Sequence, residues 1–150
     1  MMPAGYLPHT RRSPLTDSWE PLFARETAGA VQLAVQLAVQ IREAHCNARG
    51  FAHDGLLSAL ADNAMGLSAV HQARQQMAAS AANAVTVALS LDFIAVAQVG
   101  EWVEFHPTVL KVGRTLAFVE CKAVCGERLI ARGNASFRMV GVEPATDKPA

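Results

Sequence analysis

The residues with the clearest potential for chemistry lie between positions 47 and 66, where polar side chains interrupt an otherwise small and apolar chain. A loop ends at His53, Asp54 and Gly55, and the apolar residues that follow recur at the spacing of a buried helix face. Asp62 stands within that run, and carboxylates are almost never fully buried without a partner or a task. Its spacing leaves two interpretations open: Asp62 faces water on the polar edge of the helix, or it serves the chemistry of a site.

The composition narrows the class of protein. At 150 residues the chain fits one domain with a substantial core. Its 13 basic and 13 acidic residues balance, and no basic run extends beyond Arg11 and Arg12, so we expect neither a nucleic acid nor an anionic membrane as partner. No segment reaches the roughly 20 apolar residues of a membrane span, and the proline-containing N-terminus lacks the apolar core of a signal peptide. We therefore expect a soluble, cytoplasmic protein whose ligand is neutral and moderately polar.

The cysteines and histidines show no metal-binding pattern. Cys46, Cys121 and Cys125 form no CxxC pair, which argues against both a disulfide framework and a zinc site. We expect free thiols and no metal or other cofactor. Packing or surface roles are expected for the histidines without ligand spacing, which are His9, His45, His71 and His106.

The ends of the chain look unlike its middle. Residues 1–15 are rich in proline and basic residues and are expected to form a flexible tail. A single domain over 16–142 and a C-terminal tail over 143–150 follow. A short helix is expected to begin at residue 16 or 17 and to continue to Phe23.

The middle of the chain alternates between two periodicities. Every odd position from 31 to 41 is apolar, and four of these six residues are β-branched, which predicts a strand. A helix is predicted from Asp54 to about Gln76. Alternating residues then predict a strand with one buried face, built from Val85, Val87, Leu89, Leu91 and Phe93. Glycines separate three further strands at about 101–111, 114–124 and 128–140.

This order of elements predicts the α+β class. Four consecutive strands joined by short turns form an antiparallel sheet, and the lone long helix must bury its apolar side against one face of it. Such a sheet keeps open edges, which a second copy of the chain commonly covers. We therefore predict an antiparallel sheet wrapped around one central helix, in a homo-oligomer.

The loop and helix carry the pattern Asn-x-x-Gly-x-x-His-x-Gly followed by Leu-Ala-Asp, which resembles the hotdog-fold acyl-CoA thioesterases of the phenylacetic-acid-degradation (PaaI-like) subfamily. The resemblance covers residues 35–140, and within this range it includes the segments 91–94 and 111–119. The matching motif residues are Asn47, Gly50, His53, Gly55, Leu60, Ala61 and Asp62.

The resemblance implies hydrolysis of an acyl-CoA thioester, with an aromatic or medium-chain acyl group, at the interface of two subunits. It implies a homodimer that assembles further into a dimer of dimers. Asp62 matches the family's catalytic acid, which acts as nucleophile or as general base on water, and Asn47 matches a residue that orients the water or the substrate carbonyl. The remaining matches are His53 and Gly55 at the helix start, Thr86 beside the acid, and Lys111 and Arg114 near the CoA phosphates.

The geometry of one helix supports a site shared between subunits. A thioester carbonyl becomes an oxyanion on attack, and the helix start near Asp54 offers unpaired backbone N–H groups to receive it. Asp54 and Asp62 are eight residues apart, which corresponds to about 12 Å along a helix axis. One helix therefore cannot bring both groups to one carbonyl carbon, whereas two antiparallel helices about a two-fold axis can.

Asp54 departs from the family pattern. Relatives place a small residue, usually glycine, at this position, and its backbone N–H is the oxyanion donor that the family implies. Either the Asp54 carboxylate points away and the amide still functions, which we favour, or the site differs in activity or substrate.

Two alternatives on the same fold stay open. One is a non-catalytic acyl-CoA-binding module, although no DNA-binding helix pair or further domain accompanies it. The other is a hydratase or dehydratase, which needs a histidine and an acid across a C=C bond. The only such pair here is the adjacent His53 and Asp54.

Overall fold

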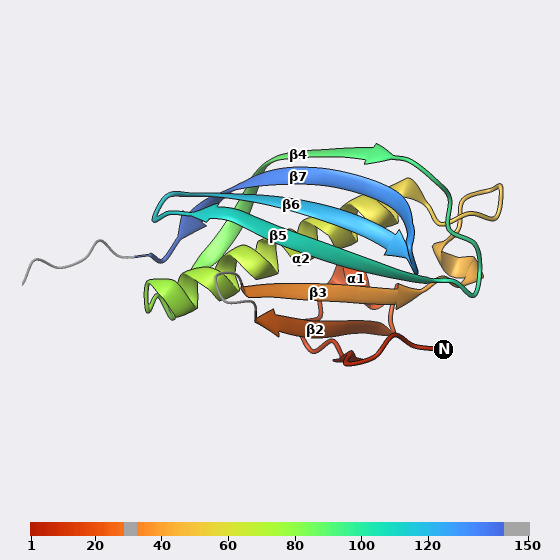
Figure 1. The fold of residues 1–150 in the computed structure, drawn as a ribbon, viewed down its shortest axis with the longest axis horizontal. Helices are drawn as coiled ribbons and strands as arrows, with labels where there is room; N and C mark the ends of the chain where they lie inside the picture. The colour runs from red at the N-terminus through yellow and green to blue at the C-terminus, as the bar shows by residue number, and fades with distance from the viewer. Residues whose placement is uncertain (29–32, 143–150) are drawn as a thin grey trace, which may run out of the picture.

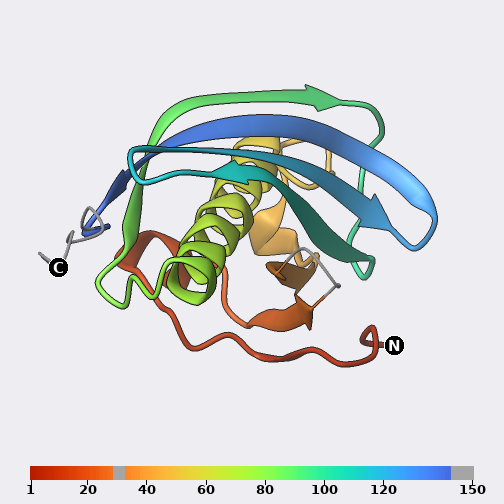
Figure 2. The same cartoon turned by 60° about the vertical axis from the view of Figure 1, so that its left-hand side comes forward.

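A long helix runs beneath a curved antiparallel sheet, as Figures 1 and 2 show. The structure, a computed structural model, describes residues 1–28 and 33–142. Its elements are β1 (Leu7–Pro8), α1 (Pro14–Asp17), β2 (Leu22–Ala28), β3 (Leu33–Gln40), a 3-10 turn (Glu43–His45), α2 (Asp54–Gln76), β4 (Asn83–Phe93), β5 (Trp102–Val112), β6 (Leu116–Cys125) and β7 (Arg128–Val140). Within the described residues, the seven strands form one sheet in the order β1-β2-β3-β5-β6-β7-β4.

The hydrophobic core lies between α2 and the concave face of the sheet. Leu57, Leu60 and Met65 of α2 are at most 2% exposed, and they share one apolar cluster with Phe105 and Phe137 from the sheet. Burying a side chain of this size stabilises a fold by about 1.5–3 kcal/mol. The core face of α2 is therefore fixed, and its polar residues lie on the remaining sides except for Ser68 and Gln72, which are buried.

The predicted α+β class, with an antiparallel sheet around one long helix, is confirmed. The helix begins and ends at the predicted residues, and the last three strands lie within a few residues of their predicted bounds. The strand predicted over 31–41 is observed over Leu33–Gln40, while residues 31 and 32 lie outside the described residues.

The strand order corrects the predicted series of hairpins. β4 pairs with β7 at the edge of the sheet, and β5 pairs with β3 instead of with β4. β4 and β7 approach closely at Gly133, where a Cβ atom would collide with the carbonyl oxygen of Ser90.

Val85, Val87, Leu89 and Phe93, predicted to lie on one buried face, are exposed. The pairing of β4 with β7 shifts between Thr86 and Ala88, so Val85 lies opposite the exposed Arg138 whereas Leu89 lies opposite the buried Ala135. The predicted alternation is therefore broken, and β4 lies at the edge of the sheet within the described chain.

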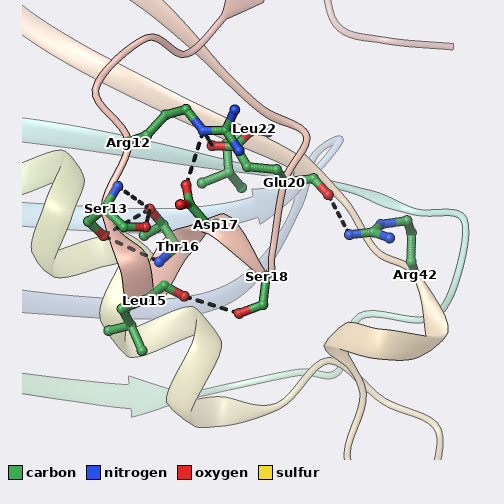
Figure 3. A network of polar contacts seen from close by, with 9 residues as sticks. All are labelled: Arg12, Ser13, Leu15, Thr16, Asp17, Ser18, Glu20, Leu22 and Arg42. Carbon is green, nitrogen blue, oxygen red and sulfur yellow. Dashed lines mark hydrogen bonds and ion pairs between the residues drawn. The ribbon is translucent and has the colours of Figure 1, made fainter.

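The N-terminal helix ends earlier than predicted. Ser13 caps α1 in a capping box, in which Ser13 Oγ accepts from Thr16 N at 3.2 Å and Thr16 Oγ1 accepts from Ser13 N at 3.1 Å (Figure 3). The predicted continuation to Phe23 is wrong, because Leu22–Ala28 form β2 and pair along their whole length with β3.

Residues 1–15, expected to form a flexible tail, lie against the domain. Tyr6 is 3% exposed, and the guanidinium carbon of Arg25 lies 4.5 Å from its ring centroid. Arg25 Nη1 also donates to the carbonyl oxygen of Ala4 at 2.7 Å. The composition of the segment suggested a tail, whereas contact between one aromatic side chain and a distant strand holds the segment against the sheet.

Several chemical features of the described residues bear on the class of protein. No helix within residues 1–28 and 33–142 has the length and apolarity needed to cross a membrane. The same residues contain no cluster of three or more His, Cys, Asp or Glu side chains that could hold a metal ion. Cys46, Cys121 and Cys125 are free thiols. Burial raises the pKa of the Cys121 thiol to about 12, so this thiol stays protonated near neutral pH.

His45 joins the N-terminal segment to the loop before α2. The side chain is 2% exposed, its Nδ1 accepts from the backbone N–H of Arg42 at 3.0 Å, and its Nε2 lies 3.1 Å from the carbonyl oxygen of Trp19. These partners assign the proton to Nε2, which donates to Trp19. Burial lowers the pKa of His45, so the folded protein holds the neutral imidazole.

Acid should therefore destabilise the protein through His45. Below the usual histidine pKa of about 6.5, the unfolded chain binds a proton that the folded chain binds less readily, so the free energy of unfolding falls as the pH falls. We expect the thermal midpoint to decline below about pH 6.5. The decline should be shallower in His45→Asn, because asparagine can accept from Arg42 but does not titrate. Part of the slope should remain, since burial also lowers the pKa of His9. Equal slopes in the two proteins would contradict this prediction.

Candidate active site

Asp62 and Thr86 meet where the middle of α2 faces β4. Thr86 Oγ1 donates a hydrogen bond of 2.7 Å to Asp62 Oδ1. The other carboxylate oxygen, Oδ2, makes no hydrogen bond to any residue that the structure describes. A carboxylate held through one oxygen and open at the other is suited to accept a proton from water. The structure thus brings together two predicted site residues that are 24 positions apart in the sequence.

A bulge in β4 and a glycine in α2 lie next to this contact. The pairing of β4 with β7 shifts by one residue between Thr86 and Ala88, as in a β-bulge. One turn of α2 beyond Asp62, Gly66 lies against Phe137, and a Cβ atom at Gly66 would be 3.3 Å from Phe137 Cε1. The small residue leaves open space next to the carboxylate.

A pocket opens beside the Asp62 carboxylate. Its walls come from α2, the start of β4, Phe137 of β7 and the N-terminal segment. The N-terminal segment contributes His9 and residues 11–13, which the sequence analysis had assigned to a tail and not to a site. The only hints to them in the sequence were the basic pair Arg11-Arg12 and the serine that caps α1.

Asn47 shapes the loop that leads to α2. Its Oδ1 accepts from the backbone N–H groups of Arg49 at 2.9 Å and Phe51 at 3.2 Å. Gly50 completes the loop with a φ of +82°, a conformation that favours glycine. Oδ1 of Asn47 is occupied within the loop. The predicted contact of this side chain with water or substrate would therefore have to be a hydrogen bond donated by its Nδ2.

His53 caps the N-terminus of α2. Its Nδ1 accepts from Gly55 N at 2.8 Å, which places the imidazole proton on Nε2. A Cβ atom at Gly55 would lie 3.0 Å from His53 Nδ1, so glycine at this position lets the cap close. With the Gly55 amide occupied, the N–H groups of Asp54 and Leu56 are the amides at the helix start without an acceptor in the described chain. The Asp54 side chain is exposed.

The predicted site residues form two groups within one subunit. Asp62 and Thr86 lie together at the middle of α2, whereas Asn47 and the amide of Asp54 lie at its N-terminal end, about 12 Å away along the helix. Lys111 and Arg114 lie in a third place, at the turn between β5 and β6. Both are exposed and do not line the Asp62 pocket.

Known proteins resemble this chain in sequence and in fold. A model of the thioesterase superfamily matches residues 49–131. The Pseudomonas aeruginosa protein PA0474, which carries a provisional esterase name, is 41% identical over 140 residues, covering 92% of this chain and 97% of that protein. A mutant of the phenylacetic acid degradation protein PaaI from Thermus thermophilus has a TM-score of 0.68 and 22% identity, covering 84% of this chain and 98% of that one. A hypothetical thioesterase from Streptococcus pneumoniae, solved with coenzyme A, has a TM-score of 0.62 and 18% identity, covering 74% and 84%.

The cap at His53 should contribute measurably to stability. Replacing a side chain that caps a helix with alanine costs about 1 kcal/mol, and we expect this loss in the free energy of unfolding of His53→Ala in urea. The matched variant His53→Asn should retain most of the stability, because its Oδ1 can accept from the Gly55 amide. Equal destabilisation in both variants would show that the hydrogen bond to Gly55 is not what His53 contributes.

Proposed function

Because the chain belongs to the thioesterase superfamily and has the hotdog fold, we propose that it hydrolyses acyl-CoA thioesters at a site built around Asp62. The observation that carries this proposal is the 2.7 Å hydrogen bond that fixes one oxygen of Asp62 beside an open pocket. The coenzyme A bound to the Streptococcus pneumoniae protein supports a CoA thioester as the substrate class.

In the proposed reaction, Asp62 acts as the general base. Thr86 holds Oδ1, and Oδ2 takes a proton from a water molecule as the water oxygen attacks the carbonyl carbon. The new C–O bond gives a tetrahedral oxyanion, which collapses as the C–S bond breaks. The proton held by Asp62 then passes to the thiolate, so the products are a carboxylic acid and the free thiol of CoA.

The oxyanion requires a donor that the same helix cannot supply. The Asp54 N–H is open and lies at the positive end of α2, but about 12 Å from Asp62 along the helix. We assign the donor to the Asp54 amide of a second subunit, whose α2 runs antiparallel. Each subunit then contributes its Asp62 to one site and its helix start to the other.

The exposed edge of the sheet supports this dimer. β4, which carries Thr86, has a free edge in the described chain and presents apolar side chains beside it. Val87 is 64% exposed, Leu89 39% and Phe93 43%. Unpaired strand edges with apolar side chains favour association, and pairing two β4 edges about a two-fold axis would bury these residues.

Lys111 and Arg114 are assigned to the CoA end of the substrate. Both are exposed cations at the β5–β6 turn, and neither forms an ion pair with a described residue. Exposed cations of this kind can bind phosphate groups as point charges or through a guanidinium fork.

Removing the carboxylate of Asp62 should abolish most of the activity. General-base catalysis contributes about 10² to 10⁴-fold, so we expect kcat of Asp62→Asn to fall by at least about 10²-fold in a free-thiol assay with a panel of acyl-CoAs. Asp92→Asn is the matched control, because Asp92 is an exposed carboxylate on β4, the strand of Thr86, and forms an ion pair with Arg132. Undiminished turnover in Asp62→Asn would refute the mechanism, and a wild-type protein that hydrolyses no acyl-CoA would indicate a binding module.

Mixing two defective subunits should restore activity if each site is shared between them. Asp62→Ala removes the base and Asn47→Ala removes the loop side chain, so each variant alone should be impaired. After unfolding and refolding together, half of the dimers are mixed, and each mixed dimer holds one intact site, so about a quarter of the wild-type activity should return. Mixing without refolding is the control. No recovery, or full activity in a protein that sediments as a monomer, would contradict the composite site.

A further inference from the structure

The N-terminal segment 9–13 forms one wall of a groove that begins at Asp62. The pocket beside Asp62 adjoins a second pocket along α2, and both are lined by His9, Arg11, Leu67 and Val70. The second pocket continues to Arg74. Asp62 and Arg74 are separated by about 18 Å along the helix axis, so the groove offers room for an extended group on one side of the thioester.

This wall is held at both ends. Before it, Tyr6 is buried beneath Arg25, and β1 pairs with β2. After it, the Ser13 capping box starts α1, and Arg12 Nε lies 3.0 Å from Asp17 Oδ1 (Figure 3). Figure 2 shows the segment passing along the side of α2 that faces away from β5, β6 and β7. The backbone of residues 9–13 is thus held in place, and His9 and Arg11 line both pockets of the groove.

Arg11 differs from the other cations that line the groove. Arg12 is engaged by Asp17, and Arg74 Nη2 donates to the carbonyl oxygen of Ala82 at 3.2 Å. Arg25 is engaged on the N-terminal segment and on β3. The Arg11 guanidinium has no hydrogen-bond or ion-pair partner among the residues that the structure describes, and Arg11 lines both pockets. His9 beside it has a pKa lowered by burial and is mainly neutral at neutral pH.

Resting on the proposed function, we propose that Arg11 is a specificity-determining residue that binds a carboxylate at the far end of the acyl group. A guanidinium binds a carboxylate through two parallel N–H donors. The remaining walls of the first pocket include Leu67, Val70 and Phe137, which suit the methylene groups between the thioester and that carboxylate.

The position of Arg11 favours an acyl carboxylate over a CoA phosphate. Arg11 lines the same pocket as Asp62, so an anion that it binds lies near the reacting carbonyl. The phosphates of CoA are separated from the sulfur by the whole neutral pantetheine arm, whereas a carboxylate on a short acyl chain lies close to the carbonyl. The substrate class is therefore the mono-CoA thioesters of dicarboxylic acids.

The test compares acyl-CoAs of equal chain length that differ in one terminal carboxylate: glutaryl-CoA with pentanoyl-CoA, adipoyl-CoA with hexanoyl-CoA, and suberoyl-CoA with octanoyl-CoA. We expect wild type to prefer the carboxylate-bearing member of at least one pair in kcat/KM. In Arg11→Gln that preference should fall by about 10-fold or more, the usual contribution of a hydrogen bond to a charged group. Arg11→Lys should keep part of the preference. Arg132→Gln, on the opposite face of the sheet, should leave it unchanged.

Other outcomes separate the two proposals. If Arg11→Gln lowers kcat/KM equally for both members of a pair, Arg11 binds the CoA moiety or supports the fold, and the inference is overturned while the hydrolase function stands. If wild type shows no preference, or prefers the uncharged member of every pair, the inference is likewise overturned. If wild type hydrolyses none of the thioesters, both proposals fail. Thermal midpoints of the Arg11 variants confirm that each change in ratio comes from a folded protein.

Discussion

The burial of α2 against the concave face of the sheet determines where the Asp62 carboxylate and the helix start at Asp54 can lie. Leu60, Ala61, Ala64 and Met65 are nearly inaccessible to solvent, so the rotation of the helix about its axis is fixed. Asp62, between these residues, must then point to the side of the helix, toward β4. Thr86 meets it there, because the edge strand curves over the helix. The position of the Asp62 carboxylate thus follows from core packing, and the hydrogen bond from Thr86 fixes its orientation.

The same helix geometry explains why the proposed site needs a second chain. A straight helix separates its N-terminal amides from its middle by a fixed rise per residue, about 12 Å between Asp54 and Asp62. A change of the Asp62 rotamer moves the carboxylate but cannot close that gap to the Asp54 amide on the same helix. The strand that carries Thr86 is also the strand with the free, apolar edge. The Asp62 carboxylate, which lacks an oxyanion donor beside it, therefore lies next to an unpaired strand edge. One symmetric dimer would supply the donor and cover the edge.

The sequence predicted most of the helices and strands but not which strands pair at the two ends of the predicted hairpin series. Periodicity identified α2 and the strands β3 and β4, and the glycines between them marked the strands β5, β6 and β7. It could not show that β5 pairs with β3, because alternation identifies a strand without identifying its partner. The N-terminal segment was misjudged for a related reason: its order depends on Tyr6 reaching Arg25, a contact between distant residues. At the site, spacing left Asp62 undecided and the resemblance supplied Thr86, while nothing local marked Arg11 as part of a pocket.

The loop-and-helix motif brings two negative charges, Asp54 and Asp62, to the proposed site. In the proposed dimer, each site would hold the Asp62 carboxylate of one subunit and the Asp54 helix start of the other, so two negative charges would lie near an oxyanion. Asp54 is exposed, and water and salt weaken its effect, while its backbone N–H keeps its direction. It also stabilises the helix start by up to about 1 kcal/mol. Arg11, from a segment outside the motif, supplies a positive charge in the Asp62 pocket. In the proposed dimer, this positive charge would offset part of the negative charge that Asp54 adds to the site.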